Sequence, residues 1–349
     1  MQQKNNIVRG RATMVVDAMN LYKICFEGVK SYALQQSNLH AVWGFMKKLR
    51  GLLNENINNH TYQISRVILF WDGPESGKLR RDIYPEYKEK RNRFFNGIDP
   101  YYQQKEKIVE LMRLLGIESY EHPFIEADDC IAEYVRQNKD KEHIIILSND
   151  NDYFQLIDKN VHIFYLNRIQ IKEHIYPKNL LINAENFEYY FEQNYKNILL
   201  KKIIIGDESD NIVGAKGFSE KSILNEVPMF IKREYDRNTL LEYALKQQAE
   251  KNRGKRLQAL IDFLKDDDRY NLSETLINLK SKKFITEECT RDIENILPLP
   301  LDLKGFYSTL KSEQYKLIHK QIMTDPDFDG DVRNFSQPFL LTNKFKKNE

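Results

Sequence analysis

The sequence contains few cysteines, and their positions suggest neither a bridge nor a metal site. The 349 residues include three, Cys25, Cys130 and Cys289, and consecutive ones are more than 100 residues apart. No CxxC spacing occurs, and no histidine pair stands near any of them. This pattern excludes a cysteine-based zinc site and a disulfide framework, and it predicts buried thiols.

Long apolar runs are also absent. No stretch approaches the roughly 20 apolar residues that are needed to cross a bilayer. The apolar run that follows the basic N-terminal stretch is too short for the core of a signal peptide. With 41% hydrophobic and 30% charged residues, the composition is typical of a soluble protein. We therefore expect a soluble, intracellular protein with no membrane partner.

The sequence also lacks flexible linkers and a large net charge. The sequence shows no internal repeat and no stretch rich in Gly and Ser or in Pro. The net charge of +2 is the balance of 53 basic and 51 acidic residues. An electrostatic function therefore has to come from local segregation of the charges.

Short apolar runs alternate with amphipathic segments in the first half of the chain. The runs at residues 13–18, 66–72 and 143–148 read as strands, and the three-and-four spacing of apolar residues at 39–57 predicts a helix. This alternation favours an α/β fold with βαβ units on a parallel sheet. Helical patterns dominate from about residue 180, and we place a domain boundary there.

Three of the predicted strands end in aspartate. Asp17 and Asp72 each close an apolar run, while Asp150 and Asp152 follow a third. The carboxyl ends of parallel strands meet at one edge of the sheet, where ligands bind. A single aspartate could equally cap a helix or form a turn, but the repetition favours convergence on one site.

Two further groups of acids are candidates for the same site. Glu126, Asp128 and Asp129 stand at the predicted start of a helix, and Asp207 and Asp210 follow another apolar run. So many carboxylates together would resist ionisation unless cations neutralised them. Oxygen ligands without His or Cys indicate Mg²⁺ or Mn²⁺, and their number suggests two ions. Two such ions suit the hydrolysis of a phosphodiester.

A basic segment with aromatic residues follows Asp72. Seven Lys or Arg against three acids between Lys78 and Arg93 make a local charge of +4, and Tyr84 and Tyr87 are interleaved with them. A solvated basic helix would show the same charges. Because the segment directly follows an inferred metal ligand, we favour contacts with single-stranded nucleic acid, through phosphates and base stacking.

Taken in order, "WDG", "RRDIYPEYKEKRN", "EADD", "SNDNDYFQL" and "IIGDESDNIVGAKGFSEKS" resemble the motifs of the flap endonuclease and 5′-3′ exonuclease family. The likeness is to its bacteriophage type, which includes phage ribonuclease H. It implies a PIN-like (Rossmann-like) nuclease domain at residues 1–180, with a helical arch at about 78–100. It also implies a helical DNA-binding region at 181–349, with a helix-turn-helix variant at about 203–226 and a C-terminal extension.

The resemblance also implies roles for individual residues. The ligands of a first Mg²⁺ would be Asp17, Asp72, Asp128 and Asp150, with Glu126 close by, and those around a second would be Asp129, Asp152, Asp207 and Asp210. Lys88 and Arg91 would act on the scissile phosphate. The DNA contacts would be Arg80, Arg81, Tyr87, Lys88, Arg91, Gly214, Lys216, Gly217, Ser219 and Lys221, with K⁺ bound at the helix-turn-helix turn.

The function that follows is a 5′-3′ exonuclease or flap endonuclease that removes primers in DNA replication. Its substrates would be DNA with a 5′ flap or 5′ end and RNA-DNA hybrids, and Mn²⁺ could replace Mg²⁺. We expect a monomer that meets replication proteins such as a single-strand binding protein or a clamp, in the host cytoplasm if a phage encodes it. Two alternatives stay open: a PIN-type endoribonuclease, which would not need the arch, and a noncatalytic branched-DNA binding protein.

Overall fold

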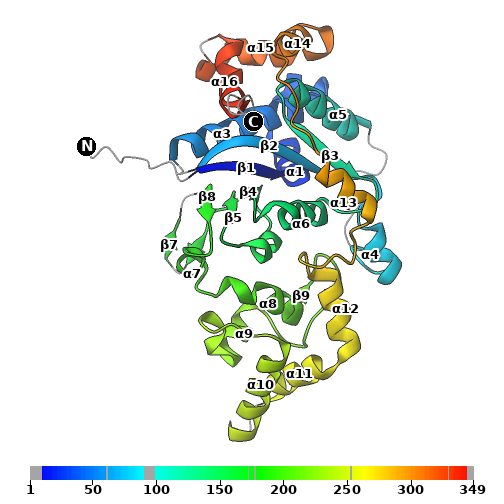
Figure 1. Ribbon diagram of the computed structural model, residues 1–349, viewed down its shortest axis with the longest axis vertical. Helices are drawn as coiled ribbons and strands as arrows, with labels where there is room; N and C mark the ends of the chain where they lie inside the picture. The colour runs from blue at the N-terminus through cyan, green and yellow to red at the C-terminus, as the bar shows by residue number, and fades with distance from the viewer. Residues whose placement is uncertain are drawn as a thin grey trace, which may run out of the picture.

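A central six-stranded sheet organises the computed structural model, which describes residues 10–59, 62–89, 99–171, 173–176, 178–251, 254–328 and 330–343 (Figure 1). The strands are β1 Gly10–Asp17, β2 Tyr62–Asp72, β3 Glu118–His122, β4 His143–Ser148, β5 Val161–Tyr165 and β8 Leu180–Ile182. Their order is β3-β2-β1-β4-β5-β8, and every neighbouring pair is parallel except β5 and β8. The predicted parallel α/β sheet is confirmed.

The central strands are buried on both faces, which explains their continuous apolar sequences. Met14, Val15 and Val16 of β1 have no exposed surface, as expected for a parallel sheet covered by helices on both sides. The helices on one face are α1 Ala18–Gly28, α2 Tyr32–Gln36, α3 His40–Asn59 and α5 Asp99–Leu114. The three-and-four spacing at residues 39–57 therefore marks a true helix, and α3 packs its apolar side on the sheet.

The last helices of the chain lie on this same face. They are α14 Leu303–Leu310, α15 Lys316–Thr324 and α16 Val332–Asn343, with the short 3₁₀ turns η4 Glu313–Tyr315 and η5 Pro326–Phe328. Their apolar side chains join the core formed by α1, α3 and α5, and Figure 1 shows them beside α3. The C-terminal helices thus pack on the six-stranded sheet, at a distance from the helices at residues 198–277 (Figure 1).

The opposite face of the sheet is covered by elements from the middle of the chain. These are α6 Ala127–Asn138, the 3₁₀ helix η1 Asn151–Leu156, α7 Phe187–Phe191 and α13 Glu287–Glu294. A small hairpin, β6 Gln170–Ile171 with β7 His174–Ile175, lies between β5 and β8 in the chain.

A third apolar core belongs to the helical region (Figure 1). Its elements are α8 Ile198–Ile205, β9 Gly206–Asp207, β10 Ile212–Val213, α9 Glu220–Glu226, α10 Arg237–Lys251, α11 Lys255–Lys265 and α12 Asp267–Ile277, with the 3₁₀ turns η2 Tyr195–Asn197 and η3 Pro228–Ile231. The helical character predicted after residue 180 is confirmed, although the division into two domains stays a prediction. Among the described residues, no helix has the length and apolar character that a membrane span requires.

Candidate active site

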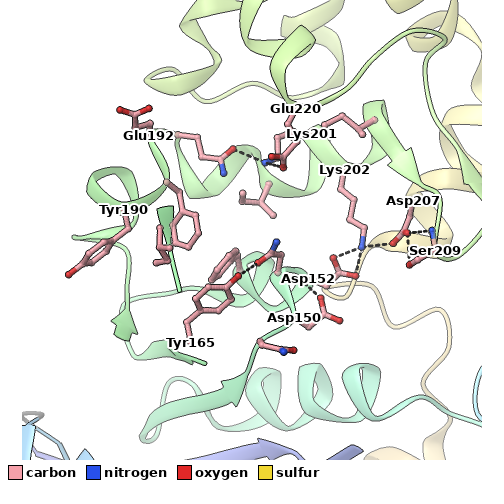
Figure 2. A pocket seen from close by; sticks show the side chains of 18 of the residues that line it. Asp150, Asp152, Tyr165, Tyr190, Glu192, Lys201, Lys202, Asp207, Ser209 and Glu220 are labelled. Carbon is pink, nitrogen blue, oxygen red and sulfur yellow. Dashed lines mark hydrogen bonds and ion pairs between the residues drawn. The ribbon is translucent and has the colours of Figure 1, made fainter. Parts of the chain in front are cut away.

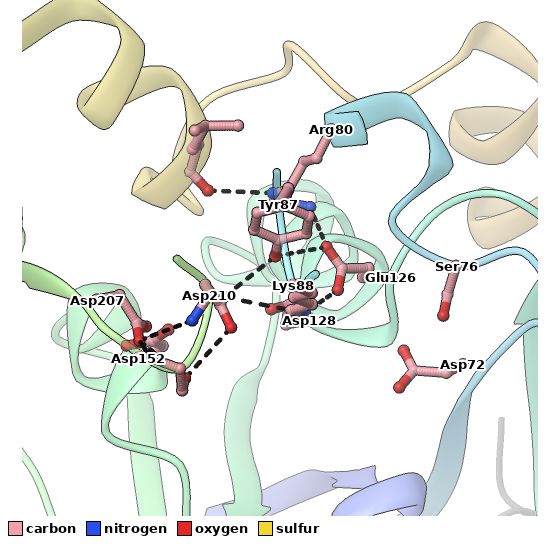
Figure 3. A network of polar contacts seen from close by, with 12 residues as sticks. Asp72, Ser76, Arg80, Tyr87, Lys88, Glu126, Asp128, Asp152, Asp207 and Asp210 are labelled. Carbon is pink, nitrogen blue, oxygen red and sulfur yellow. Dashed lines mark hydrogen bonds and ion pairs between the residues drawn. The ribbon is translucent and has the colours of Figure 1, made fainter. Parts of the chain in front are cut away.

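The acids predicted from the strand ends meet at one edge of the sheet. Asp17 is the last residue of β1 and Asp72 the last of β2, while Asp150 follows β4. A cavity of about 160 Å³ opens there, and Figure 3 shows several of its carboxylates facing one another. Its acidic lining residues are Asp17, Asp72, Glu126, Asp128, Asp150, Asp152, Asp207 and Asp210. These are eight of the nine predicted metal ligands, and Asp129 is not among the described residues that line the cavity.

Asp17 is held by three hydrogen bonds at the start of α1. Its carboxylate accepts one from the Asn20 backbone N–H at 3.0 Å, one from the Ser148 hydroxyl at 3.1 Å and one from the Tyr153 hydroxyl at 3.2 Å. Burial, with the nearby charges of Asp72 and Asp150, raises the pKa of Asp17 to about 7. Such a carboxylate gains from a cation that would offset its lost hydration.

The two other strand-end aspartates cap the elements that follow them in space. Asp72 accepts a hydrogen bond from the backbone N–H of Ala127, the first residue of α6, at 2.9 Å. Asp150 accepts a hydrogen bond from the backbone N–H of Asp152 at 2.9 Å and so caps the start of η1. The capping interpretation therefore applies, and the ligand role stays a prediction that capping does not exclude, because each carboxylate has a second oxygen.

The start of α6 carries three acids whose carboxylate oxygens lie within 4.8 Å of one another: Glu126, Asp128 and Asp129. Burial and the neighbouring charges of Asp129 and Glu126 raise the pKa of Asp128. Burial alone would raise the pKa of Glu126 too, but Lys88 and Arg80 outweigh it and hold that pKa at about 2. Asp128 is thus the member of this group that most lacks a counter-charge.

Arg80, predicted to contact DNA, is instead buried and paired with Asp129. Arg80 is 2% exposed, and its guanidinium donates to both oxygens of Asp129, to Glu126 at 2.7 Å and to the backbone carbonyl of Leu276 at 3.0 Å. In this structure it is an internal counter-ion with no exposed face for a DNA phosphate. Asp129, in turn, accepts from Arg80 with both of its oxygens, although burial still raises its pKa.

Lys202 is a site residue that the sequence analysis missed. It extends from α8 and contacts the carboxylates of Asp152 and Asp207, the latter at 2.9 Å (Figure 2). Burial opposes ionisation of Asp207, but Lys202 outweighs it and lowers the pKa of Asp207 to about 2, whereas burial raises that of Asp152 to about 6. A lysine inside the apolar run "KKIIIG" that precedes Asp207 was the available signal.

The basic segment after Asp72 also reaches the cavity. The Lys88 ammonium contacts Glu126 and lies 3.9 Å from Asp210, and the Lys88 backbone has a positive φ of 58°. The hydroxyl of Tyr87 donates to Glu126 at 3.0 Å and to Asp210 at 3.2 Å, and its ring is 3% exposed. The predicted stacking role of Tyr87 would therefore require residues 84–89 to move.

The structure describes only part of the rest of the predicted arch. α4 Lys78–Ile83 forms its beginning, and Arg81 donates to the backbone carbonyl of Ser76 at 3.1 Å. Arg91 lies outside the described residues, which resume at residue 99. Its predicted role on the phosphate stays a prediction.

The predicted helix-turn-helix variant consists of α8 and α9, joined by the β9–β10 hairpin. Ser219 caps α9 through a reciprocal pair of hydrogen bonds with Ser222. Lys216, Gly217 and Lys221 are exposed beside it. Gly214 is buried in the hairpin instead, where a Cβ would stand 2.3 Å from the Ile204 carbonyl oxygen. Its predicted approach to phosphate has no free surface in this structure.

A second cavity of about 950 Å³ adjoins the acidic one (Figure 2). It lies between η1, α7 and α8, and it shares Asp150, Asp152, Lys202, Asp207 and Ser209 with the acidic cavity. Aromatic side chains such as Tyr165 and Tyr190 line its other side. Three of the acids, Asp150, Asp152 and Asp207, therefore line the larger cavity as well.

The donor set of the acidic cavity fits hard divalent cations. Its ligating groups are carboxylates, which suit Mg²⁺ and Mn²⁺. Asp17 and Asp128 both have pKa values raised first by burial, so a bound cation would restore their ionised forms.

Comparisons with known proteins agree with this geometry. Residues 12–187 match the family model described as 5′-3′ exonuclease, N-terminal resolvase-like domain. A 5′-3′ exonuclease of Mycoplasmopsis pulmonis is 32% identical over 248 residues, which cover 69% of this chain and 78% of the relative. One from Buchnera aphidicola subsp. Schizaphis graminum is 25% identical over 213 residues, covering 60% and 68%.

Solved structures share the fold. A bacteriophage T5 flap endonuclease in complex with DNA and metal ions has a TM-score of 0.59 at 17% identity, covering 82% of this chain and 99% of that one. The catalytic core of Rad2 with a DNA substrate has a TM-score of 0.51 at 17% identity, covering 88% and 89%. Given the site geometry, the matched domain and the relatives, this chain belongs to the 5′-3′ exonuclease family and is a nuclease.

Proposed function

We propose that this nuclease uses two Mg²⁺ ions to hydrolyse phosphodiesters near the 5′ end of DNA or RNA-DNA substrates, as an exonuclease and at 5′ flaps. The observation that carries the proposal is the convergence of eight carboxylates, from β1, β2, α6, η1 and the β9–β10 hairpin, on one cavity. Structural relatives with bound DNA and metal ions support it.

The family resemblance divides the carboxylates into two groups. Asp17, Asp72, Asp128 and Asp150, with Glu126 beside them, would hold one ion. Asp152, Asp207 and Asp210 would hold the other, and the contact of Lys202 with Asp152 and Asp207 would change as this ion binds. The ions would activate a water molecule and stabilise the leaving oxygen.

The chain supplies the remaining charge through Lys88. Its ammonium stands among Glu126 and Asp210, at the mouth of the cavity and on the segment that leads into the predicted arch. We assign it the stabilisation of negative charge on the scissile phosphate, an interaction that grows stronger in the transition state. Exposed Lys216 and Lys221, at the turn before α9 and in its first turn, would contact the duplex backbone beyond the cut.

The path of the 5′ strand, the acceptance of RNA and a K⁺ site are further parts of the same proposal. The 5′ strand would pass under the arch, RNA would be accepted in it, and K⁺ would bind at the helix-turn-helix turn. Replication proteins that recruit the enzyme, and its monomeric state, also stay predictions.

The experiment that tests the function is cleavage of a 5′-labelled flap substrate with RNA or DNA in the 5′ strand. We expect Mg²⁺-dependent cutting near the junction or stepwise from the 5′ end. Asp150→Asn should lower the rate by more than about 100-fold, because it removes a charge that a metal ion needs. Asp140→Asn, on an exposed turn, is the matched control.

Two results would contradict the proposal. Tight binding without cleavage by the wild type, in Mg²⁺ and in Mn²⁺, would favour a branched-DNA binding protein. Cleavage of single-stranded RNA that ignores the 5′ end would favour an endoribonuclease.

A further inference from the structure

The C-terminal end of α12 accepts hydrogen bonds from two buried side chains, one on α4 and one on η1. The backbone carbonyl of Leu276 accepts a hydrogen bond from Arg80 Nε at 3.0 Å, and that of Ile277 accepts one from Gln155 Nε2 at 3.2 Å. The last carbonyls of a helix have no partner within the helix. Arg80 and Gln155 are each 2% exposed, so this helix end is capped without water.

Both capping residues lie next to the predicted ligands. Gln155 stands in η1, the element that Asp150 caps and that contains Asp152, and its Oε1 accepts a hydrogen bond from the Leu279 backbone N–H at 3.3 Å. Arg80 stands in α4 and reaches the start of α6. The end of α12 is therefore joined directly to η1 through Gln155, and to the start of α6 through Arg80.

Arg80 binds the acids of α6 with the rest of its guanidinium. Nη1 donates to Glu126 at 2.7 Å, and Nη1 and Nη2 together bind both oxygens of Asp129 (Figure 3 shows the Glu126 contact). The Phe284 ring covers the guanidinium, with 4.4 Å from Cζ to the ring centre. The planar fork thus makes its contacts to side chains and backbone at once, which a lysine could not reproduce.

The charges around Arg80 require this arrangement. Glu126 is 5% exposed and Asp129 is 3% exposed, so their carboxylates would be costly to ionise without a buried cation. Burial acts against the charge of Arg80, but Asp129 and Glu126 outweigh it and raise the pKa of the guanidinium. Arg80 and Asp129 form a neutral internal pair, whereas Asp128 is left to face the cavity.

We infer that Arg80 is a positioning residue of the proposed nuclease, which sets the start of α6 against the end of α12, and that Asp129 is its counter-ion and not a metal ligand. The inference rests on the proposed function for its kinetic part. In this arrangement, Arg80 determines where Glu126 and Asp128 stand, and it links the DNA-binding helices to the acids.

The first test separates positioning from phosphate contact by comparing two adjacent arginines. We expect Arg80→Lys to lower kcat about 10-fold to 100-fold, with KM and the Kd for a flap substrate changed by less than about twofold. Arg81→Gln should do the reverse, raising Kd and weakening its dependence on salt. A rise in Kd for Arg80→Lys with unchanged kcat would make Arg80 a DNA contact and overturn the inference.

The second test measures metal binding by calorimetry and needs no cleavage. Asp129→Asn should bind Mg²⁺ with the wild-type affinity within about threefold, whereas Asp128→Asn should lose about 10-fold or more. An equal loss in both variants would make Asp129 a ligand and overturn the assignment. Should the wild type fail to cleave any flap substrate, the proposed function fails, and this comparison still decides the role of Asp129.

A third measurement tests the pairing of Arg80 with Asp129 through stability alone, in variants that lack one or both of the charges. The double variant Arg80→Met/Asp129→Leu removes both charges, and we expect it to unfold at a higher denaturant concentration than Arg80→Met alone. If the double variant loses as much stability as Arg80→Met and Asp129→Leu lose together, the two residues do not form a pair.

Discussion

Asp17 serves two purposes with one side chain. It caps α1 by accepting from the Asn20 backbone N–H, and it faces the acidic cavity beside Asp72 and Asp150. Burial contributes most to its raised pKa of about 7. A carboxylate in this state favours its protonated form in the folded protein until a cation binds near it.

This shift predicts a pH dependence of stability in metal-free protein. From about pH 4 to about pH 7 the folded state holds a proton on Asp17 that the unfolded chain has lost, so stability falls as pH rises. Asp17→Asn should remove the part of that fall that comes from Asp17 and stabilise the metal-free protein at about pH 8 by at most about 4 kcal/mol.

The check is urea denaturation at about pH 5 and about pH 8, with EDTA present and with Asp140→Asn as the control. A wild type whose stability rises between these pH values, in step with Asp17→Asn, would show that the pKa of Asp17 is not raised.

Lys88 is the residue for which binding and catalysis can be separated. Because its charge is placed to act on the phosphate in the transition state, we expect Lys88→Ala to lower kcat by about 100-fold or more. Duplex affinity, which the helix-turn-helix variant would dominate, should change by less than about threefold. Single-turnover cleavage and a binding titration measure the two, and equal losses would remove the catalytic role.

At the scale of elements, the β9–β10 hairpin places Asp207 and Asp210 in the cavity. Gly206 precedes Asp207 with a φ of +80°, and a Cβ there would stand 2.5 Å from the Gly214 nitrogen and from the Ile212 carbonyl oxygen. The hairpin can therefore close only because both glycines lack a side chain.

Gly206→Ala should destabilise the protein by at least about 3 kcal/mol, since it adds a backbone clash to an unfavourable φ. It should also slow cleavage by displacing Asp207. Gly217→Ala is the matched variant: its φ is +79°, but no atom of the described residues other than its own and those of its two chain neighbours lies within 4 Å of the added Cβ. We expect a cost of about 1 kcal/mol there. Chemical denaturation gives both values, and equal costs would contradict the clash.

At the scale of the whole molecule, the C-terminal helices pack against α3 and belong to the apolar core on one face of the sheet. Phe335 of α16 stacks on Trp43 of α3 with 6.1 Å between ring centres, and Phe328 contacts both rings. Arg50 of α3 donates to the backbone carbonyl of Phe335 at 3.1 Å. Phe328 and Phe335 thus pack on the body of the protein.

Phe335→Ala should lower the free energy of unfolding by about 3 to 5 kcal/mol, because it leaves a cavity in a core with no exposure. The site lies at the carboxyl edge of the sheet, so kcat at low temperature should stay within about twofold of wild type. Leu297→Ala, at a side chain that is 74% exposed, is the control for denaturation. A large fall in kcat without a loss of stability would show that α16 acts on the site.

Local sequence patterns were enough to predict the parallel sheet and the strand-end acids of the candidate site. Local periodicity marks α3 and the buried strands, and acids at the ends of parallel strands converge whatever joins the strands, so Asp17, Asp72 and Asp150 could be predicted. Ser219 was recognisable as a cap because capping depends on residues within one turn.

Only the tertiary structure decided how the charges pair. Arg80 and Arg81 are adjacent in a basic run, yet one is buried against Asp129 and the other is half-buried at the surface. Lys202 meets Asp152 across 50 residues of chain. A charged side chain reaches several ångströms in any direction, and its partner depends on which elements pack beside it, a choice made by the cores of the whole molecule and absent from any local pattern.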